Sequence, residues 1–206
     1  MPRAFTELER KKIRERLLAA GKGFINRAGT RLLVVDDIAR EAGISKGSFY
    51  SFFPSREDFI LSVFEAWEDE YRSSLLADVI AGAGSPRERL ERFFIEAFSL
   101  VEREPGLARL GMGEIEQLME GLPPERLLAH RKSDSQTMEA AIGSWVEKGI
   151  VSREDLPALG GVFMSVFAIA IQRKVFPEGS YEGAIRLIAE ALAWRLSDQG
   201  GKHGRE

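Results

Sequence analysis

The fold is decided by residues 36–58, whose sequence is DDIAREAGISKGSFYSFFPSRED. Ile38 and Ala42 lie one helical turn apart among charged residues, a pattern that predicts a short amphipathic helix. Gly43 stands where a left-handed C-terminal cap is expected, and Ser45 is a good N-cap for a second helix. The stretch therefore predicts two short helices joined by a tight turn, a helix-turn-helix.

The second helix of this pair is expected to have one apolar and one polar face. Phe49, Phe52 and Phe53 share the apolar face and should point into the core. The outer face carries a cation, a bare backbone position, two hydroxyls and a phenol, on Lys46, Gly47, Ser48, Tyr50 and Ser51. Such groups can contact phosphates and base edges in the major groove of DNA. An ordinary solvated surface helix is the alternative interpretation.

A third helix is expected directly after the pair. Pro54 ends the preceding segment, and Ser55 and Asp58 are spaced as the N-cap and N3 residues of a capping box. We therefore predict that the chain leaves the helix-turn-helix in a new helix covering residues 55–81.

Residues 35–58 closely resemble the TetR family of transcriptional regulators, and the resemblance extends more loosely over residues 1–65. It implies an amino-terminal DNA-binding domain, followed by a helical domain that binds an effector and forms a homodimer. It also implies that the hydroxyls, Lys46 and Tyr50 contact DNA and that Arg56 stands where the family has a phosphate-binding cation. The complete set of DNA-binding residues predicted in this way is Ser45, Lys46, Gly47, Ser48, Tyr50, Ser51 and Arg56.

Three positions depart from the family pattern, and one of them is Arg56, which stands where the family usually has Lys. Val34 stands where the family usually has Thr or Ser, whose hydroxyl caps the first helix of the pair and contacts a phosphate. Phe52 stands where the family often has His or Tyr, and it fits the apolar face. The sequence therefore predicts that a phosphate contact is missing at Val34.

The charge of the chain is unevenly distributed. The formal net charge is -3, but residues 1–60 contain 12 Lys and Arg against 8 Asp and Glu. Much of the positive charge lies on the predicted first helix, at Arg10, Lys11, Lys12, Arg14 and Arg16. Each residue alone fits an ordinary solvated face, whereas the cluster is expected to raise the local attraction for DNA.

Helix signals continue to the end of the chain without useful strand alternation, which predicts an all-α fold of about nine helices. One of these helices is expected at residues 107–119 and another at residues 152–175. The predicted domains are a helix-turn-helix domain, a helical effector-binding and dimerisation domain, and a disordered tail, at residues 1–54, 55–198 and 199–206.

The last two predicted helices carry more apolar surface than one neighbouring helix covers. Burial of that surface inside one copy of the chain is one interpretation. The other, implied by the resemblance, is a homodimer through these helices that places two helix-turn-helix motifs about 34 Å apart on a pseudo-palindromic operator.

A regulator of this kind needs an input, which we expect to be an apolar or amphipathic small molecule of unknown identity. The candidate effector pocket consists of Phe94, Phe98, Met112, Glu116, Trp145 and Phe163. Ordinary core packing is the alternative role of the apolar members. By the resemblance, effector binding would release a repressor from its operator.

Enzymatic function is not indicated. The chain has no Cys, and His130 and His203 are isolated, so we expect no metal, no cofactor and no catalytic triad. The start lacks the apolar segment of a signal peptide, and the apolar region at residues 156–171 is shorter than the about 20 residues of a membrane-spanning helix. We therefore expect a cytoplasmic protein with no membrane partner, and the 156–171 region as a buried helix.

A second function remains open from the sequence. The chain could be a helical ligand-binding or adaptor protein that has lost DNA binding, and Val34 is the residue that favours this alternative.

Overall fold

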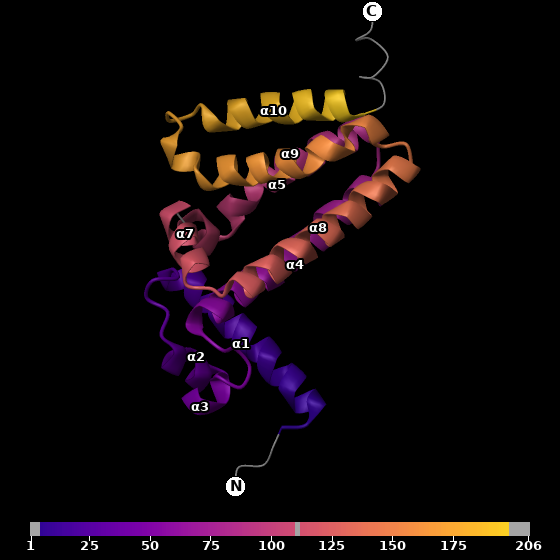
Figure 1. The fold of residues 1–206 in the computed structure, drawn as a ribbon. Coiled ribbons are helices and arrows are strands. Elements are labelled where there is room, and N and C mark those ends of the chain that lie inside the picture. The colour runs from indigo at the N-terminus through magenta and orange to yellow at the C-terminus, as the bar shows by residue number, and fades with distance from the viewer. Residues whose placement is uncertain (1–4, 110–111, 198–206) are drawn as a thin grey trace, which may run out of the picture. The chain divides into compact units, whose positions relative to one another are not determined.

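The computed structural model describes residues 5–109 and 112–197, so the tail predicted at 199–206 lies outside the described residues (Figure 1). Within the described ranges the chain forms ten α-helices and two 3₁₀ helices and no strand. The prediction of an all-α fold is confirmed.

The helices form two compact units. The first contains residues 1–70 and 104–126, and the second contains residues 71–103 and 127–206. Neither unit ends at the domain boundary predicted after residue 54. Two helices, α4 (Arg56–Ala81) and α8 (Pro124–Glu147), continue from one unit into the other.

The first unit is built around the crossing of α1 and α4. Besides the start of α4, its helices are α1 (Glu7–Ala28), α2 (Val35–Glu41), α3 (Lys46–Phe49), α6 (Pro105–Arg109) and α7 (Met112–Glu120). Gly21 of α1 lies at the crossing, where a Cβ atom would stand 2.6 Å from Phe59 Cζ and 2.7 Å from Val63 Cγ2. Glycine is therefore required at this point, because any larger residue would displace the buried ring of Phe59.

Asn26 attaches α6 to the end of α1. Its Oδ1 accepts a hydrogen bond from the backbone N–H of Gly106 (2.7 Å), and its Nδ2 donates to Glu104 Oε2 (2.9 Å). A Cβ on Gly106 would lie 2.9 Å from Trp67 Cη2, so the close approach of the α6 backbone also requires glycine. The helix expected at residues 107–119 corresponds to α6 and α7, and residues 110–111 between them lie outside the described part.

In the second unit, α5 is the central element. It spans Pro86–Arg103 and packs against both α9 (Leu156–Ile171) and α10 (Tyr181–Leu196). The start of α9 and the end of α10 are joined by a bidentate ion pair, in which Arg195 donates to the buried carboxylate of Asp155 at 2.7 and 2.8 Å. Short 3₁₀ helices occupy Arg153–Asp155 and Arg173–Val175, so the helix expected at residues 152–175 contains three segments.

The expectation that α9 is a buried helix is wrong for a single copy of the chain. Among its residues, only Leu159, Val166, Ala170 and Ile171 are buried. By length and composition alone, Arg153–Ile171 (19 residues, mean hydropathy 1.5) is long and apolar enough to cross a membrane, and only 22% of it is buried. Most of the apolar surface of α9 is therefore left uncovered within one copy of the chain. Homodimer interfaces have the same apolar character.

Candidate DNA-binding surface

The turn between α2 and α3 has the geometry that its sequence predicts. Gly43 has a positive φ of 74°, and the backbone N–H of Ile44 donates to the carbonyl of Ala39 at 2.9 Å. The hydroxyl of Ser45 then accepts from the backbone N–H of Ser48 at 3.1 Å, which confirms Ser45 as the N-cap of α3. Local hydrogen bonds thus fix the turn both where it leaves α2 and where it enters α3.

We call residues 46–53 the recognition segment. Its apolar and polar faces are separated as predicted. Phe49 and Phe53 are fully buried, whereas Phe52 is only half-buried. On the opposite side, Tyr50 is 45% exposed, and within the part of the chain that the structure describes its hydroxyl has no hydrogen-bond partner. Lys46, Gly47 and Ser51 are also exposed, and Ser48 is half-buried with its hydroxyl 2.9 Å from that of Ser45.

Lys46 is held by α2. Its Nζ lies 2.7 Å from Asp36 Oδ2, and both side chains are about half exposed. This hydrogen bond, with the negative charge of Asp36, raises the pKa of Lys46 above its ordinary value. An exposed ion pair of this kind is weak, so a phosphate can replace Asp36 as the partner of Lys46.

Arg56 is already occupied by contacts within the protein. Its Nε donates to the carbonyl of Leu33 (2.9 Å), its Nη2 donates to that of Thr30 (2.5 Å), and its Nη1 pairs with Glu57 (3.1 Å). These contacts fix the loop that leads into α2. The guanidinium therefore holds the motif together and is not presented to a phosphate as the sequence comparison suggested.

Val34 precedes α2 without capping it. The side chain makes no capping hydrogen bond and is 48% exposed. The backbone of Val34 still accepts the first helical hydrogen bonds, from Asp37 and Ile38. The start of α2 thus has no capping side chain, and the missing phosphate contact at Val34 stays a prediction.

Two arginines of α1 cover the aromatic residues that follow α3. The guanidinium of Arg10 lies 4.6 Å from the centre of the Phe52 ring and donates to the carbonyl of Ser51 at 2.9 Å. The guanidinium of Arg14 lies 4.5 Å from the centre of the Phe53 ring. These cation–π contacts were not predicted, although the spacing of four residues between the two arginines places them on one face of α1.

Comparison with known proteins agrees with this geometry. Residues 17–63 match the sequence model of the bacterial regulatory proteins, tetR family. The chain thus carries a TetR-family domain at residues 17–63.

Among curated relatives, transcriptional regulator AcuR of Cereibacter sphaeroides is 31% identical over 115 residues, which are 53% of this chain and 50% of AcuR. The HTH-type transcriptional repressor KstR2 of Mycobacterium tuberculosis is 28% identical over 105 residues, 51% of this chain and 52% of KstR2. The chain spans about half the length of these relatives.

Solved structures share the fold over nearly the whole chain. A regulator of the TetR/AcrR family from Thermobifida fusca has a TM-score of 0.56 at 24% identity, covering 94% of this chain and 98% of that one. RolR in complex with resorcinol has a TM-score of 0.63 at 20% identity, covering 96% of this chain and 93% of RolR. At these identities the likeness concerns the fold alone.

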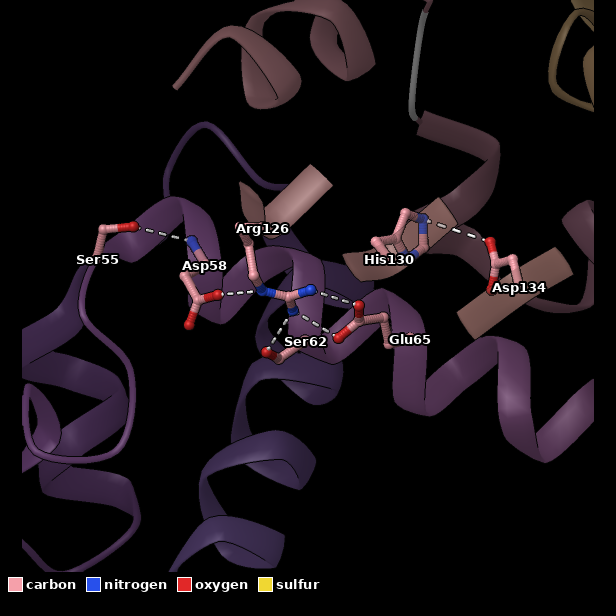
Figure 2. A network of polar contacts seen from close by, with 7 residues as sticks. All are labelled: Ser55, Asp58, Ser62, Glu65, Arg126, His130 and Asp134. Atoms are coloured by element: carbon pink, nitrogen blue, oxygen red, sulfur yellow. Dashed lines mark hydrogen bonds and ion pairs between the residues drawn. The ribbon is translucent and has the colours of Figure 1, made fainter. Parts of the chain in front are cut away.

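In the first unit, Arg126 fixes the beginning of α4 (Figure 2). Figure 2 shows its guanidinium directed at three residues of α4: Nε donates to Asp58 Oδ1 (2.5 Å), Nη1 and Nη2 donate to both oxygens of Glu65 (2.8 and 2.7 Å), and Nη2 donates to Ser62 Oγ (3.3 Å). We call these four residues the Arg126 cluster. The hydrogen bonds to Glu65 raise the pKa of Arg126 further above its usual value, so it remains charged throughout the physiological pH range.

The predicted capping box at the start of α4 is only half formed. Ser55 Oγ accepts from the backbone N–H of Asp58 at 3.0 Å, as expected of an N-cap. The carboxylate of Asp58, which is mostly buried, is bonded to Arg126. A residue 68 positions away therefore takes the place of the local partner.

The second unit contains an aromatic cluster around Trp145. Its members are Phe93 and Phe94 of α5, Trp145 of α8 and Phe163 of α9, with ring centres 5.2 to 6.3 Å apart. The indole Nε1 of Trp145 is buried and has no hydrogen-bond partner among the described residues. Phe93 was absent from the predicted pocket, although it is adjacent to Phe94.

The other predicted pocket residues are not in this cluster. The backbone carbonyl of the buried Phe98 accepts a hydrogen bond from Tyr181 Oη at 3.4 Å. Met112 and Glu116 belong to α7 in the first unit, where Glu116 is exposed and the side chain of Met112 is outside the described part. Of the six predicted residues, Phe94, Trp145 and Phe163 are brought together within the second unit.

We predict that Arg126→Gln destabilises the first unit. The substitution removes charged hydrogen bonds and leaves the largely buried Asp58 carboxylate without its cation, which should lower the free energy of unfolding by about 2 kcal/mol. Urea unfolding followed by circular dichroism measures the change. Arg40→Gln is the matched control, because its ion pair with Asp37 is exposed and should contribute about 0.5 kcal/mol or less. Equal midpoints for the two variants would contradict the prediction.

Proposed function

We propose that the chain is a sequence-specific transcriptional repressor, which binds a pseudo-palindromic operator as a homodimer and is released by a small-molecule effector. The observation that carries the proposal is the recognition segment, where Phe49 and Phe53 anchor one side and the polar side remains exposed. KstR2 and NemR of Escherichia coli are HTH-type transcriptional repressors, which supports repression as the direction of control. Such a protein would act in the cytoplasm, on chromosomal DNA.

We assign the DNA contacts to the exposed side of the motif. Lys46 and Tyr50 would bind phosphates or base edges, the bare backbone of Gly47 would allow close approach, and the remaining contacts would come from the hydroxyls of Ser45, Ser48 and Ser51. Arg56 is left out of this set because its guanidinium is bound to backbone carbonyls and Glu57.

The homodimer would form through α9 and α10. Large apolar side chains on these helices are exposed in one copy of the chain: Met164 is 70% exposed, Leu187 68% and Trp194 47%. Small residues on α9, Gly160 and Gly161, are exposed as well and would allow close approach of a second copy. An apolar surface of this kind on two adjacent elements supports a two-fold, self-complementary interface.

The effector would bind at the aromatic cluster of the second unit. A buried donor without a partner costs about 1–3 kcal/mol, so a ligand that brings an acceptor oxygen to Trp145 Nε1 would recover this free energy. The expected class is a small apolar or aromatic molecule with an uncharged oxygen acceptor. The resorcinol bound by RolR belongs to this class and supports the choice.

The DNA-binding assignment predicts the behaviour of two variants. Lys46→Ala removes a phosphate partner and Tyr50→Phe removes one hydroxyl, and each should weaken operator binding by about 1–3 kcal/mol. Footprinting on the DNA that flanks the chain's own coding region identifies the operator, and mobility shift measures the affinity. Lys148→Ala, an exposed change in the second unit, is the control. Absence of any protected palindrome would favour the ligand-binding or adaptor protein that has lost DNA binding.

The interface assignment predicts that Leu187→Glu dissociates the homodimer. A carboxylate on the apolar surface would be desolvated without a partner, so the variant should be monomeric at concentrations where the wild-type chain is dimeric. Light scattering after size-exclusion chromatography measures the mass. Leu128→Glu introduces the same charge at a residue of α8 that is 64% exposed and should leave the mass unchanged. A dimeric Leu187→Glu variant would place the interface elsewhere.

The effector assignment predicts a selective effect of Trp145→Phe. Compounds for the test are small phenols and aromatic ketones, resorcinol among them, and binding is followed by thermal shift and by release of operator DNA. Loss of the indole N–H should weaken a bound compound about tenfold, as expected for one hydrogen bond of about 1.4 kcal/mol. Trp67→Phe is the control, because it changes a buried indole of the first unit that also has no hydrogen-bond partner among the described residues. Equal ligand affinity in both variants would reject Trp145 as the ligand's donor.

A further inference from the structure

Cations that form no ion pair within the described residues are concentrated on one short stretch of α1. This basic stretch, Arg10–Arg16, spans seven residues and contains a single acidic residue, Glu15. Its cations are Arg10, Lys11, Lys12, Arg14 and Arg16. Among the described residues, none of the five forms an ion pair.

The other cations of the same region are neutralised. Within residues 5–60, every described Lys or Arg outside the basic stretch pairs with a carboxylate. The pairs are Lys22–Glu70, Arg27–Glu41, Arg31–Glu114, Arg40–Asp37, Lys46–Asp36 and Arg56–Glu57. The excess of positive charge in this part of the chain therefore acts from α1.

The basic stretch is attached to the recognition segment. The stacking of Arg10 on Phe52 and of Arg14 on Phe53 orients both guanidinium groups without neutralising them. Arg10 also donates to the carbonyl of Ser51, which leaves its other N–H groups for an external acceptor. Both arginines are thus held next to the residues proposed to enter the major groove.

A groove of about 870 Å³ joins the basic stretch to the start of α3. Lys12 and Arg16 line it from α1, and Ser45 and Ser48 line it from α3 and its N-cap. Glu9 and Glu15 lie on the same groove, but the Glu9 carboxylate is engaged by the backbone N–H and hydroxyl of Thr6 in the capping box of α1. Cations of α1 and two proposed DNA contacts therefore share one continuous surface.

We infer that the basic stretch binds the sugar–phosphate backbone of the operator, beside the part of the major groove that α3 enters. This inference rests on the proposed function. Seven helical residues extend over about 10 Å, and duplex DNA carries one negative charge per about 1.7 Å of its axis, so the stretch reaches several phosphates. Contiguity with α3 selects duplex DNA among polyanions, because one rigid body presents both surfaces to the same partner.

The test measures how binding depends on salt. The double variant Lys12→Gln/Arg16→Gln removes two exposed cations, and Arg131→Gln/Lys132→Gln removes the same charge from exposed positions on α8. Each protein is titrated with a fluorescent duplex of about 30 base pairs, close to three helical turns, over a series of KCl concentrations. Each lost phosphate contact should reduce the slope of log affinity against log salt by about 0.9. A homodimer of the first variant loses two contacts in each of its two copies, so its slope should fall by about 3.6 and that of the control not at all.

Further variants separate charge from structure. Lys12→Arg/Arg16→Lys retains both cations and should restore the wild-type slope, whereas a purely structural role would not predict this rescue. An unchanged slope in Lys12→Gln/Arg16→Gln would overturn the inference, as would an equal loss in the α8 control. If that unchanged slope accompanies operator binding that still depends on Tyr50, the proposed function stands. If the wild-type chain binds no duplex at all, the proposed function itself is wrong.

Discussion

The buried rings of Phe49, Phe53 and Phe59 are the contact on which the DNA-binding surface depends. Helix α3 has only four residues and cannot be stable by itself, because so short a helix does not repay the cost of nucleation. Its orientation comes from ring contacts with centres 4.9 to 5.6 Å apart, which join α3 to the buried start of α4. The contacts with DNA that are proposed for α3 and its neighbouring residues are positioned by this packing.

Polar groups fix the two segments that flank the helix-turn-helix. Arg56 fixes the loop before α2 through backbone carbonyls, and the Arg126 cluster fixes the first turns of α4. Arg126 belongs to the first turn of α8, and both α4 and α8 continue into the second unit.

Features set by neighbouring residues could be predicted from the sequence. The left-handed turn at Gly43 and the caps at Ser45 and Ser55 depend on groups within a few positions, and each formed as expected. Contacts between distant residues could not be predicted in this way. Arg56 has the sequence position of a phosphate ligand, yet carbonyls more than 20 positions earlier occupy its guanidinium. The same limit applies to the candidate effector pocket. An apolar pattern does not show to which unit a helix belongs, so Met112 and Glu116 of the first unit were grouped with aromatic residues of the second.

Affinity and specificity have different physical sources on this surface. Unpaired cations on α1 act on phosphates of any sequence, and their effect weakens with salt. Specificity must come from the few polar groups of the short recognition segment, since only these can reach base edges. Val34 removes one neutral, directional phosphate contact that would help to fix the register of α3 on the duplex. If the basic stretch supplies the missing attraction, it does so through long, charged side chains, which favour DNA in general and leave the selection of a site to the residues around Tyr50.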